Sequence, residues 1–267
     1  MKRALRRLAF GFLLVASARE SAWGADHCAP SPLPEPRELG VSLGLGLEHA
    51  NYSTERYAGN FTGVHLGVSY AQANVHGLSW DVSAGVPAYQ LVRNGQDEEG
   101  IGDPWLRGRL RLLQSRARDL ALGVALGMSF PLGDAEADLG MGHVMIHPAV
   151  WLDSAGERVH AHWTFSYGSV LGAGDHGSGP GPLVNPMNAS EFAASGTATW
   201  IPVRGLQLSA GAMGAVPTST QGGEARAVAS LGLVLPLGPV QVGSEFSWAL
   251  LGDPFDQKLE VTARAAF

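Results

Sequence analysis

The 267-residue sequence contains one cysteine, Cys28, so no disulfide within the chain can stabilise the fold. It also lacks an apolar run that could cross a membrane as a helix, because prolines and glycines interrupt its longest apolar stretch, residues 227–243. Charged residues make up only 16% of the chain, and the 24 acidic residues outnumber the 18 Lys and Arg. Phosphate binding needs clustered basic side chains, so this balance argues against nucleic acid as a partner.

Residues 1–24 are predicted to be a secretory signal peptide. Basic residues precede the short apolar run Leu8–Ala16, an order typical of export signals. Small residues allow cleavage after Ala18 or, preferably, after Gly24. Removing residues 1–24 deletes five basic side chains and one acidic side chain, which changes the formal charge from −6 to −10. The proline-rich residues 25–38 are expected to form a periplasmic tether.

The end of the chain alternates strictly between apolar and polar residues. From Leu259 to Phe267, every second residue is apolar, which predicts a strand with one apolar face and one polar face. Bacterial outer-membrane barrels commonly end in this way, on a terminal aromatic residue. The resemblance implies that the barrel-assembly machinery recognises Phe267.

Similar alternation recurs along the chain and predicts an all-β fold. Only helices and closed barrels satisfy their backbone groups in lipid, so an exported chain with many alternating segments indicates a barrel. We predict a transmembrane antiparallel up-and-down β-barrel of about twelve strands over residues 39–267, and single-chain bacterial barrels require an even number of strands. The predicted strands are 39–51, 60–74, 77–92, 100–114, 118–131, 143–153, 158–171, 190–202, 206–217, 225–236, 239–250 and 257–267.

The predicted connections fall into two classes. Those after even strands are short, whereas those after odd strands are mostly longer and acidic, as in residues 94–100 and 133–140. Barrels pair short periplasmic turns with longer external loops, so both termini are expected in the periplasm. The longest loop, residues 172–189, either extends outside the barrel or folds back into its mouth.

The alternation also assigns a lipid face and a lumen face to each strand. Outer-membrane lipid is therefore an expected partner, and aromatic residues near the strand ends are expected to form two girdles. Inward-facing glycines, including Gly123, Gly211 and Gly232, are expected to leave space in the lumen. A soluble β-sandwich or a periplasmic barrel would alternate as well, but the predicted strands are longer than the usual five or six residues. The girdle residues are Tyr70, Trp80, Trp200 and Phe267 at the periplasmic end, and Phe130, Tyr167, Phe192 and Trp248 at the external end.

Strand 100–114 is unusual because its lumen face is basic. Lipid-facing leucines place Arg107, Arg109 and Arg111 inward, in a row along one wall. One interpretation is a polar constriction that selects an anionic or amphipathic solute. The alternative is a set of ion pairs that fills the lumen and makes the wall rigid. The other predicted lumen charges are Asp81, Glu48, Glu245, Glu260 and Arg264.

Four histidines lie on or near two adjacent predicted strands: His143, His147, His160 and His162. Imidazoles at this spacing can bind zinc or copper if strand pairing brings His147 close to the others. Histidines that hydrogen-bond water in a lumen are commoner, so we predict no metal site and no cofactor.

Two glycine-containing turns resemble a known family. Gly100-Ile-Gly-Asp-Pro-Trp-Leu106 precedes one strand, and Phe130-Pro-Leu-Gly-Asp134 closes the next. A Gly-x-Gly-Asp turn followed about thirty residues later by Pro-x-Gly-Asp resembles the outer-membrane transporter family of the meta-pathway of phenol degradation, mainly over residues 100–152. The resemblance implies passage of small aromatic or hydrophobic compounds. From the residues themselves, Gly102, Asp103, Gly133 and Asp134 are expected to form tight turns at the rim, with the carboxylates accepting hydrogen bonds.

The sequence therefore predicts an outer-membrane barrel for passive passage of a small-molecule solute. A barrel with an occluded lumen and a structural or surface-recognition role is the main alternative. A lipid hydrolase is a minor one, because the lipid faces carry no adjacent Ser–His pair and the sequence has no Gly-x-Ser-x-Gly turn. We predict that the protein is not an enzyme.

Overall fold

A computed structural model describes residues 40–53, 58–75, 78–115, 119–171, 188–203, 205–218, 224–252 and 255–267. The predicted signal peptide, the predicted tether and most of the loop 172–189 lie outside these ranges. Within the described ranges, no helix is long and apolar enough to cross a membrane.

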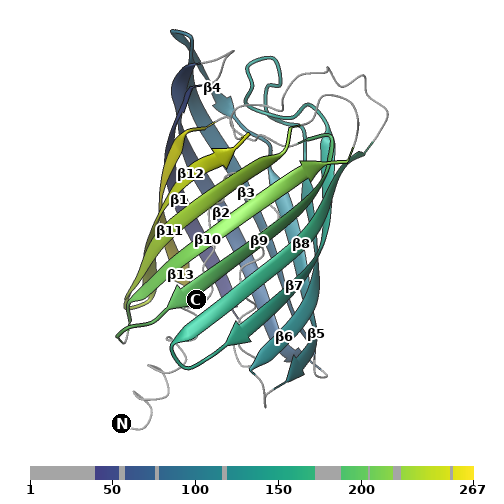
Figure 1. The fold of residues 1–267 in the computed structure, drawn as a ribbon, viewed down its shortest axis with the longest axis vertical. Coiled ribbons are helices and arrows are strands. Elements are labelled where there is room, and N and C mark those ends of the chain that lie inside the picture. Colours follow the sequence, from purple (N-terminus) through teal and green to yellow (C-terminus); the bar gives the residue numbers. More distant parts are fainter. Residues whose placement is uncertain are drawn as a thin grey trace.

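The described residues form thirteen strands, all paired antiparallel in one closed sheet (Figure 1). The strand β1 pairs with both β2 and β13, which closes the barrel between the two ends of the chain. The strands are β1 Gly40–Ser53, β2 Ala58–Val75, β3 Leu78–Arg93, β4 Gln96–Ile101, β5 Trp105–Ser115, β6 Leu120–Ser129, β7 Val144–Ala155, β8 Val159–Leu171, β9 Ser190–Trp200, β10 Gln207–Pro217, β11 Arg226–Leu237, β12 Val240–Leu251 and β13 Gln257–Ala266.

The barrel wall has twelve positions because β4 and β5 share one of them. Both strands pair with β3, β4 near the outer rim and β5 further along, and residues 102–104 interrupt them. The predicted continuous strand 100–114 is therefore wrong at this point. Pro104 has no backbone N–H to donate to a neighbouring strand, which is consistent with a break there.

Residues 94–100 are not the predicted loop. The pairing of β3 with β4 continues to the turn residues Asn94 and Gly95, whose φ angles are +50° and +82°. Positive φ at both central residues is the requirement of a tight two-residue hairpin, and an Asn-Gly pair meets it readily. The acidic stretch therefore forms a hairpin that extends above the wall instead of a long loop.

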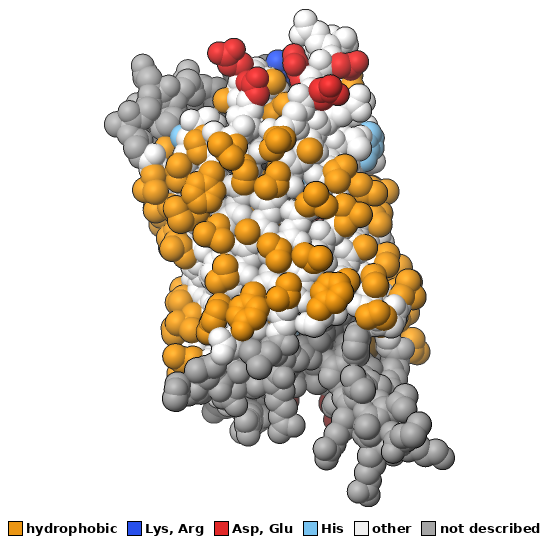
Figure 2. All heavy atoms as spheres, turned by 180° about the vertical axis from the view of Figure 1, so that it is seen from behind, with side chains coloured by type: hydrophobic (Ala, Val, Ile, Leu, Met, Phe, Trp, Pro, Cys, Tyr) orange, Lys and Arg blue, Asp and Glu red, His pale blue; other side chains and the backbone are white. Residues whose placement is uncertain are grey.

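The outside of the wall is apolar and its inside is mostly polar. Exposed leucines, valines and aromatic residues form a broad band on the outer surface, and acidic side chains gather above it at the outer rim (Figure 2). This is the inverse of a soluble protein and fits a chain whose solvent on the outside is lipid. Aromatic pairs mark both edges of the band. Tyr70 and Trp80 are 5.6 Å apart between ring centroids near the rim of the short turns, and Tyr167 and Phe192 are 5.0 Å apart near the other rim.

Candidate functional site: the charged lumen and its apolar mouth

The three arginines of β5 all point inward, and all three are buried. Arg109 lies directly opposite Asp81 of β3. Its Nη2 is 2.7 Å from Asp81 Oδ2, and its Nε donates to both carboxylate oxygens at 2.9 and 3.1 Å. This geometry, with two guanidinium nitrogens on one carboxylate, is the strong form of an ion pair. It holds Arg109 against the wall.

The flanking arginines are also engaged by neighbours on the wall. The guanidinium of Arg107 lies 5.7 Å from the ring centroid of Trp105, and Arg111 Nη1 donates to Gln114 Oε1 at 3.2 Å. Trp105 in turn lies over Gly85, where an added Cβ would stand 2.8 Å from the indole. The row of arginines is thus a supported part of the wall, with its charge directed into the lumen.

A row of carboxylates lies on a different part of the wall. Strand register places Glu48 of β1 opposite Glu260 of β13, which in turn lies opposite Glu245 of β12. Like charges in this arrangement repel, and cationic or hydrogen-bonding neighbours offset the repulsion. His65 Nε2 lies 2.7 Å from Glu48 Oε1, and Lys258 Nζ lies 3.7 Å from Glu48 Oε2.

The predicted lumen charges lie on two parts of the wall. Asp81 of β3 lies beside the arginines of β5, and Glu48, Glu260 and Glu245 lie along β1, β13 and β12. Arg264 lies apart from both rows, with its guanidinium donating to Ser42 Oγ at 2.7 and 3.0 Å. Lys258 is a further inward charge that was not predicted, although it alternates with the outward residues of the last strand in the same way as Glu260.

An ion pair near the outer rim was also missed. Arg226 of β11 bonds Glu191 of β9 across the intervening β10, and both side chains are buried. The second oxygen of Glu191 accepts hydrogen bonds from Asn188, at 3.1 Å from its amide N and 2.7 Å from its Nδ2. Both ionic residues occupy inward positions, but no local pattern links strands that are not adjacent.

The two rim turns come together in space. Asp103, in the break between β4 and β5, accepts hydrogen bonds from the amides of Gly133 at 2.9 Å and Met141 at 2.6 Å. Asp134 instead caps its own turn, accepting from the amides of Glu136 and Ala137. The β6–β7 loop, residues 130–143, is therefore fastened to the break in the wall by one buried carboxylate.

The glycines of these turns serve a different purpose from the one expected. None of Gly100, Gly102 and Gly133 has a positive φ. An added Cβ on Gly100 would stand 3.0 Å from the Leu139 side chain, and one on Gly102 would stand 2.5 Å from the Tyr89 ring. An added Cβ on Gly133 would stand 2.6 Å from the Leu139 carbonyl oxygen. These glycines therefore make room for neighbours.

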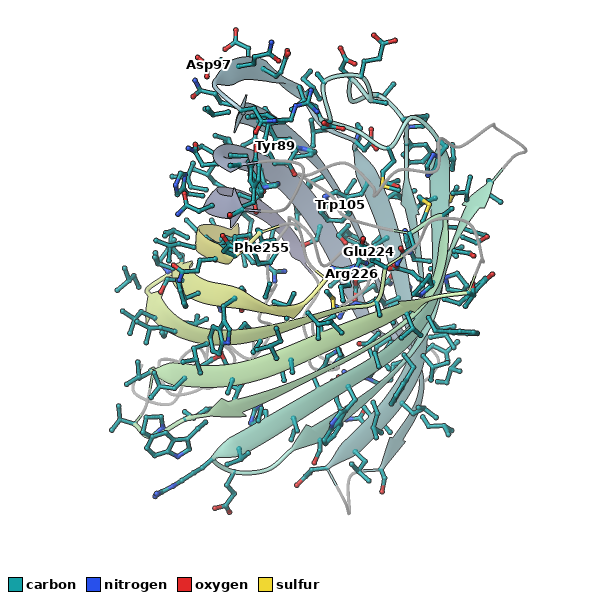
Figure 3. All side chains as sticks on the ribbon, turned by 45° about the horizontal axis from the view of Figure 1, so that its top comes forward. Tyr89, Asp97, Trp105, Glu224, Arg226 and Phe255 are labelled. Atoms are coloured by element: carbon teal, nitrogen blue, oxygen red, sulfur yellow. The ribbon has the colours of Figure 1, made fainter. Side chains whose placement is uncertain are left out.

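Leu139 belongs to an apolar cluster inside the outer end of the barrel, which we call the apolar mouth. Partly buried Ala137 and Met213 pack against it. Figure 3 looks toward this end, where Tyr89, Trp105, Arg226 and Phe255 project inward from different parts of the wall. The apolar mouth consists of Ala50, Tyr52, Phe61, Tyr89, Leu91, Leu139, Val228 and Phe255.

Space remains further down, along β9 to β12. Inward-facing residues at mid-height there are partly exposed, in contrast to the largely buried inward residues of β3, β5 and β7. Gly211 and Gly232 belong to this region, and an added Cβ on Gly211 would stand 3.0 Å from Ser230 Oγ. The expected space at Gly123 is filled by the buried Trp151 ring. The partly exposed inward residues are Ala193, Ser195, Thr197, Gly211, Ser230, Gly232 and Glu245.

The histidines do not form one cluster. His162 contacts Asp153 through Nδ1 and Thr164 Oγ1 through Nε2, the latter at 2.9 Å. His160 and His162 of β8 pair with residues near the end of β7, whereas His147 is buried near the start of β7, beside Gly168. The predicted approach of His147 to His160 and His162 is therefore wrong. Among the described residues, no group of three His, Cys, Asp or Glu side chains could hold a metal ion.

No protein-family model matches the sequence, and no curated protein matches it. The fold is similar to that of the COG4313 outer membrane channel from Pseudomonas putida F1, with a TM-score of 0.69 and 12% identity over 92% of this chain and 100% of that chain. The NanC porin gives a TM-score of 0.59 with 9% identity, covering 83% and 98% of the two chains. The CymD monoaromatic hydrocarbon channel gives 0.51 with 9% identity, covering 85% and 88%.

These likenesses show a shared fold, the closed barrel of outer-membrane channels and porins. Together with the apolar outer band and the charged interior, they place the chain among outer-membrane β-barrels.

Proposed function

We propose that the protein is a passive channel for a small solute across the outer membrane. The observation that carries this proposal is the partly exposed strip of small and hydroxyl-bearing residues along the inner face of β9 to β12. A lumen filled for structural purposes would bury such residues under large side chains, as Trp151 buries Gly123. The charged rows beside the strip supply the polar surface on which a hydrated solute moves.

Arg107, Arg109, Arg111 and Asp81 form one side of the constriction in this proposal, and Glu245 and Glu260 form the other. Arg264 lies nearer the periplasmic rim and acts at the exit. The fastening of the β6–β7 loop by Asp103 keeps the outer entrance narrow. A solute that carries both an apolar part and a polar group suits a route that begins in an apolar layer and continues between charged walls.

We also propose kinship with the meta-pathway transporter family. The hydrogen bond between Asp103 and Gly133 joins the two turns that resemble that family, which supports this proposal. The amide of Phe267 donates to the carbonyl of Val41 at 2.9 Å, so the proposed signal for the barrel-assembly machinery lies at the seam where the barrel closes. Lipid is the partner of the outer apolar band. Export by residues 1–24 and a tether over 25–38 remain part of the proposal.

The second candidate function is a structural barrel with a closed lumen. The apolar mouth favours it, since Leu139 is only 2% exposed and fills the outer end. Single-channel conductance of the refolded protein in a planar bilayer, under a salt gradient, separates the two. Discrete current steps with a measurable ion preference are expected. A heat-modifiable, correctly folded barrel that passes neither ions nor small uncharged solutes would contradict the channel and leave the structural role.

A further inference from the structure

Leu139 occupies the apolar mouth in the manner of a bound ligand. It comes from a loop, whereas most of its neighbours are fixed on the strands β1, β2, β3 and β11. Glycine at position 100 leaves room for its side chain, since an added Cβ would stand 3.0 Å from Leu139 Cδ1. The surrounding wall is therefore shaped around an apolar group that the wall itself does not supply.

Hydrogen bonds on both sides of Leu139 hold the β6–β7 loop in place. The amide of Met141 and that of Gly133 both bond Asp103, and the amide of Leu139 donates to the carbonyl of Asp134 at 2.9 Å. Asp138, the neighbour of Leu139, pairs with Arg93 of β3. These contacts fix the backbone, so the Leu139 side chain would leave the site by rotation about its own side-chain bonds.

The wall of the site is aromatic, and its floor is polar. Phe61 and Tyr89 meet edge to face, with ring centroids 5.9 Å apart and planes at 88°. Beneath them lies the buried pair of His65 and Glu48, with Nε2 and Oε1 2.7 Å apart, and the His65 ring lies 5.7 Å from the Tyr89 ring between centroids. Such walls bind rings through the same edge-to-face contacts, and a polar floor orients a small polar substituent.

We infer that the apolar mouth is a binding site for small uncharged molecules with one apolar ring, and that Leu139 is its internal competitor. This inference rests on the proposed function, because the site lies across the outer entrance of the lumen. A ring that displaces Leu139 stands directly above the charged rows and the partly exposed strip. Molecules without a ring or an equivalent apolar group gain nothing there.

The test uses ion current through the full-length protein in planar bilayers, with benzamide and acetamide as matched probes. Both carry the same amide, and only benzamide carries a ring. In Leu139→Ala the site is vacated, so current is expected to rise and benzamide is expected to block it at concentrations where acetamide has no effect. Wild-type protein should need roughly tenfold more benzamide, because the competitor occupies the site most of the time. In Leu139→Phe a tethered ring fills the site, so benzamide should have no effect.

Leu132→Ala is the matched control, because Leu132 lies in the same loop and is 72% exposed. It should behave as wild type. Equal effects of benzamide and acetamide on the current of Leu139→Ala would overturn the inference, while the current itself would uphold the channel.

A second readout tests ligand binding at the apolar mouth independently of ion conduction. Methyl NMR of leucine-labelled protein in nanodiscs reports the Leu91 methyl shifts on addition of benzamide, whether or not the barrel conducts. If no variant conducts, the channel proposal fails, and shifts at Leu91 that vanish in Leu139→Phe still support the site. Absence of those shifts in Leu139→Ala overturns it.

Discussion

The carboxylate of Asp103 accepts a hydrogen bond from the amide of Gly133 at 2.9 Å, and this contact joins two turns thirty residues apart in the sequence. It also positions Leu139 in the apolar mouth, because Gly133 and Met141 bracket that residue and both bond the same carboxylate. The break between β4 and β5 is what leaves Asp103 available for this purpose. The hydrogen bonds that hold the β6–β7 loop therefore depend on the break between β4 and β5.

Replacing Asp103 by alanine should release the β6–β7 loop while the barrel stays folded. Loss of a buried acceptor of two backbone amides costs about 1–3 kcal/mol, borne here by the closed state of the loop. Hydrogen exchange at Gly133 and Met141 should accelerate by about 5- to 150-fold, since each 1.4 kcal/mol corresponds to a factor of ten. Asp97→Ala, at an exposed position of the hairpin, is the control. Unchanged exchange in Asp103→Ala would show that other contacts hold the loop.

Replacing Arg107, Arg109 and Arg111 together by glutamine should shift ion preference toward cations. The substitution removes the basic row and leaves the carboxylate row on β1, β13 and β12, so the potential inside the lumen becomes more negative. The measurement is the reversal potential under a salt gradient. Arg158→Gln, in the exposed turn between β7 and β8, keeps the same chemistry outside the lumen and should have little effect. An unchanged reversal potential in the triple variant would make the arginines scaffold.

The pair of Asp81 and Arg109 should show strong coupling in a double-mutant cycle. Arg109→Gln alone leaves a buried carboxylate without its guanidinium partner and should destabilise the barrel by about 3 kcal/mol in urea unfolding from lipid vesicles. The double variant Asp81→Asn/Arg109→Gln should recover much of that loss. If the two single effects simply add in the double variant, the ion pair contributes no coupling.

Gly123→Ala should destabilise the barrel, whereas Gly108→Ala should be nearly neutral. An added Cβ on Gly123 would clash with the Trp151 ring and with the backbone carbonyl of Leu110, while one on Gly108 meets nothing within 4 Å. Overpacking of this kind costs about 1–3 kcal/mol. The two glycines lie in neighbouring strands, Gly108 on the lipid face and Gly123 on the lumen face, so Gly108→Ala controls for adding a methyl group to this part of the wall without a clash. Equal midpoints of urea unfolding would show that Trp151 moves aside without cost.

Much of the barrel could be predicted because its rules are local. A pleated strand turns successive side chains to opposite faces, so alternation within strand 158–171 is enough to send His160 and His162 inward. The inward positions of the three arginines and of Asp81 follow from the same rule, and so do the aromatic pairs at the rims. The break at residues 102–104 disturbs local pairing without changing face, which is why the inward assignment of Trp105 survives it.

Tertiary structure alone decided which of these side chains meet. Alternation gives a face but not a partner, so it could not show that Glu48, Glu260 and Glu245 would align or that Arg226 would reach Glu191 across a strand. The burial of Leu139 could not be predicted either. It lies in an acidic, glycine-containing loop without periodicity, where local sequence does not indicate which side chains are buried. Its position depends on Asp103, Gly100 and the strands of the opposite wall. Such contacts are determined by closure of the barrel, which brings together residues distant in sequence only after every strand has found its register.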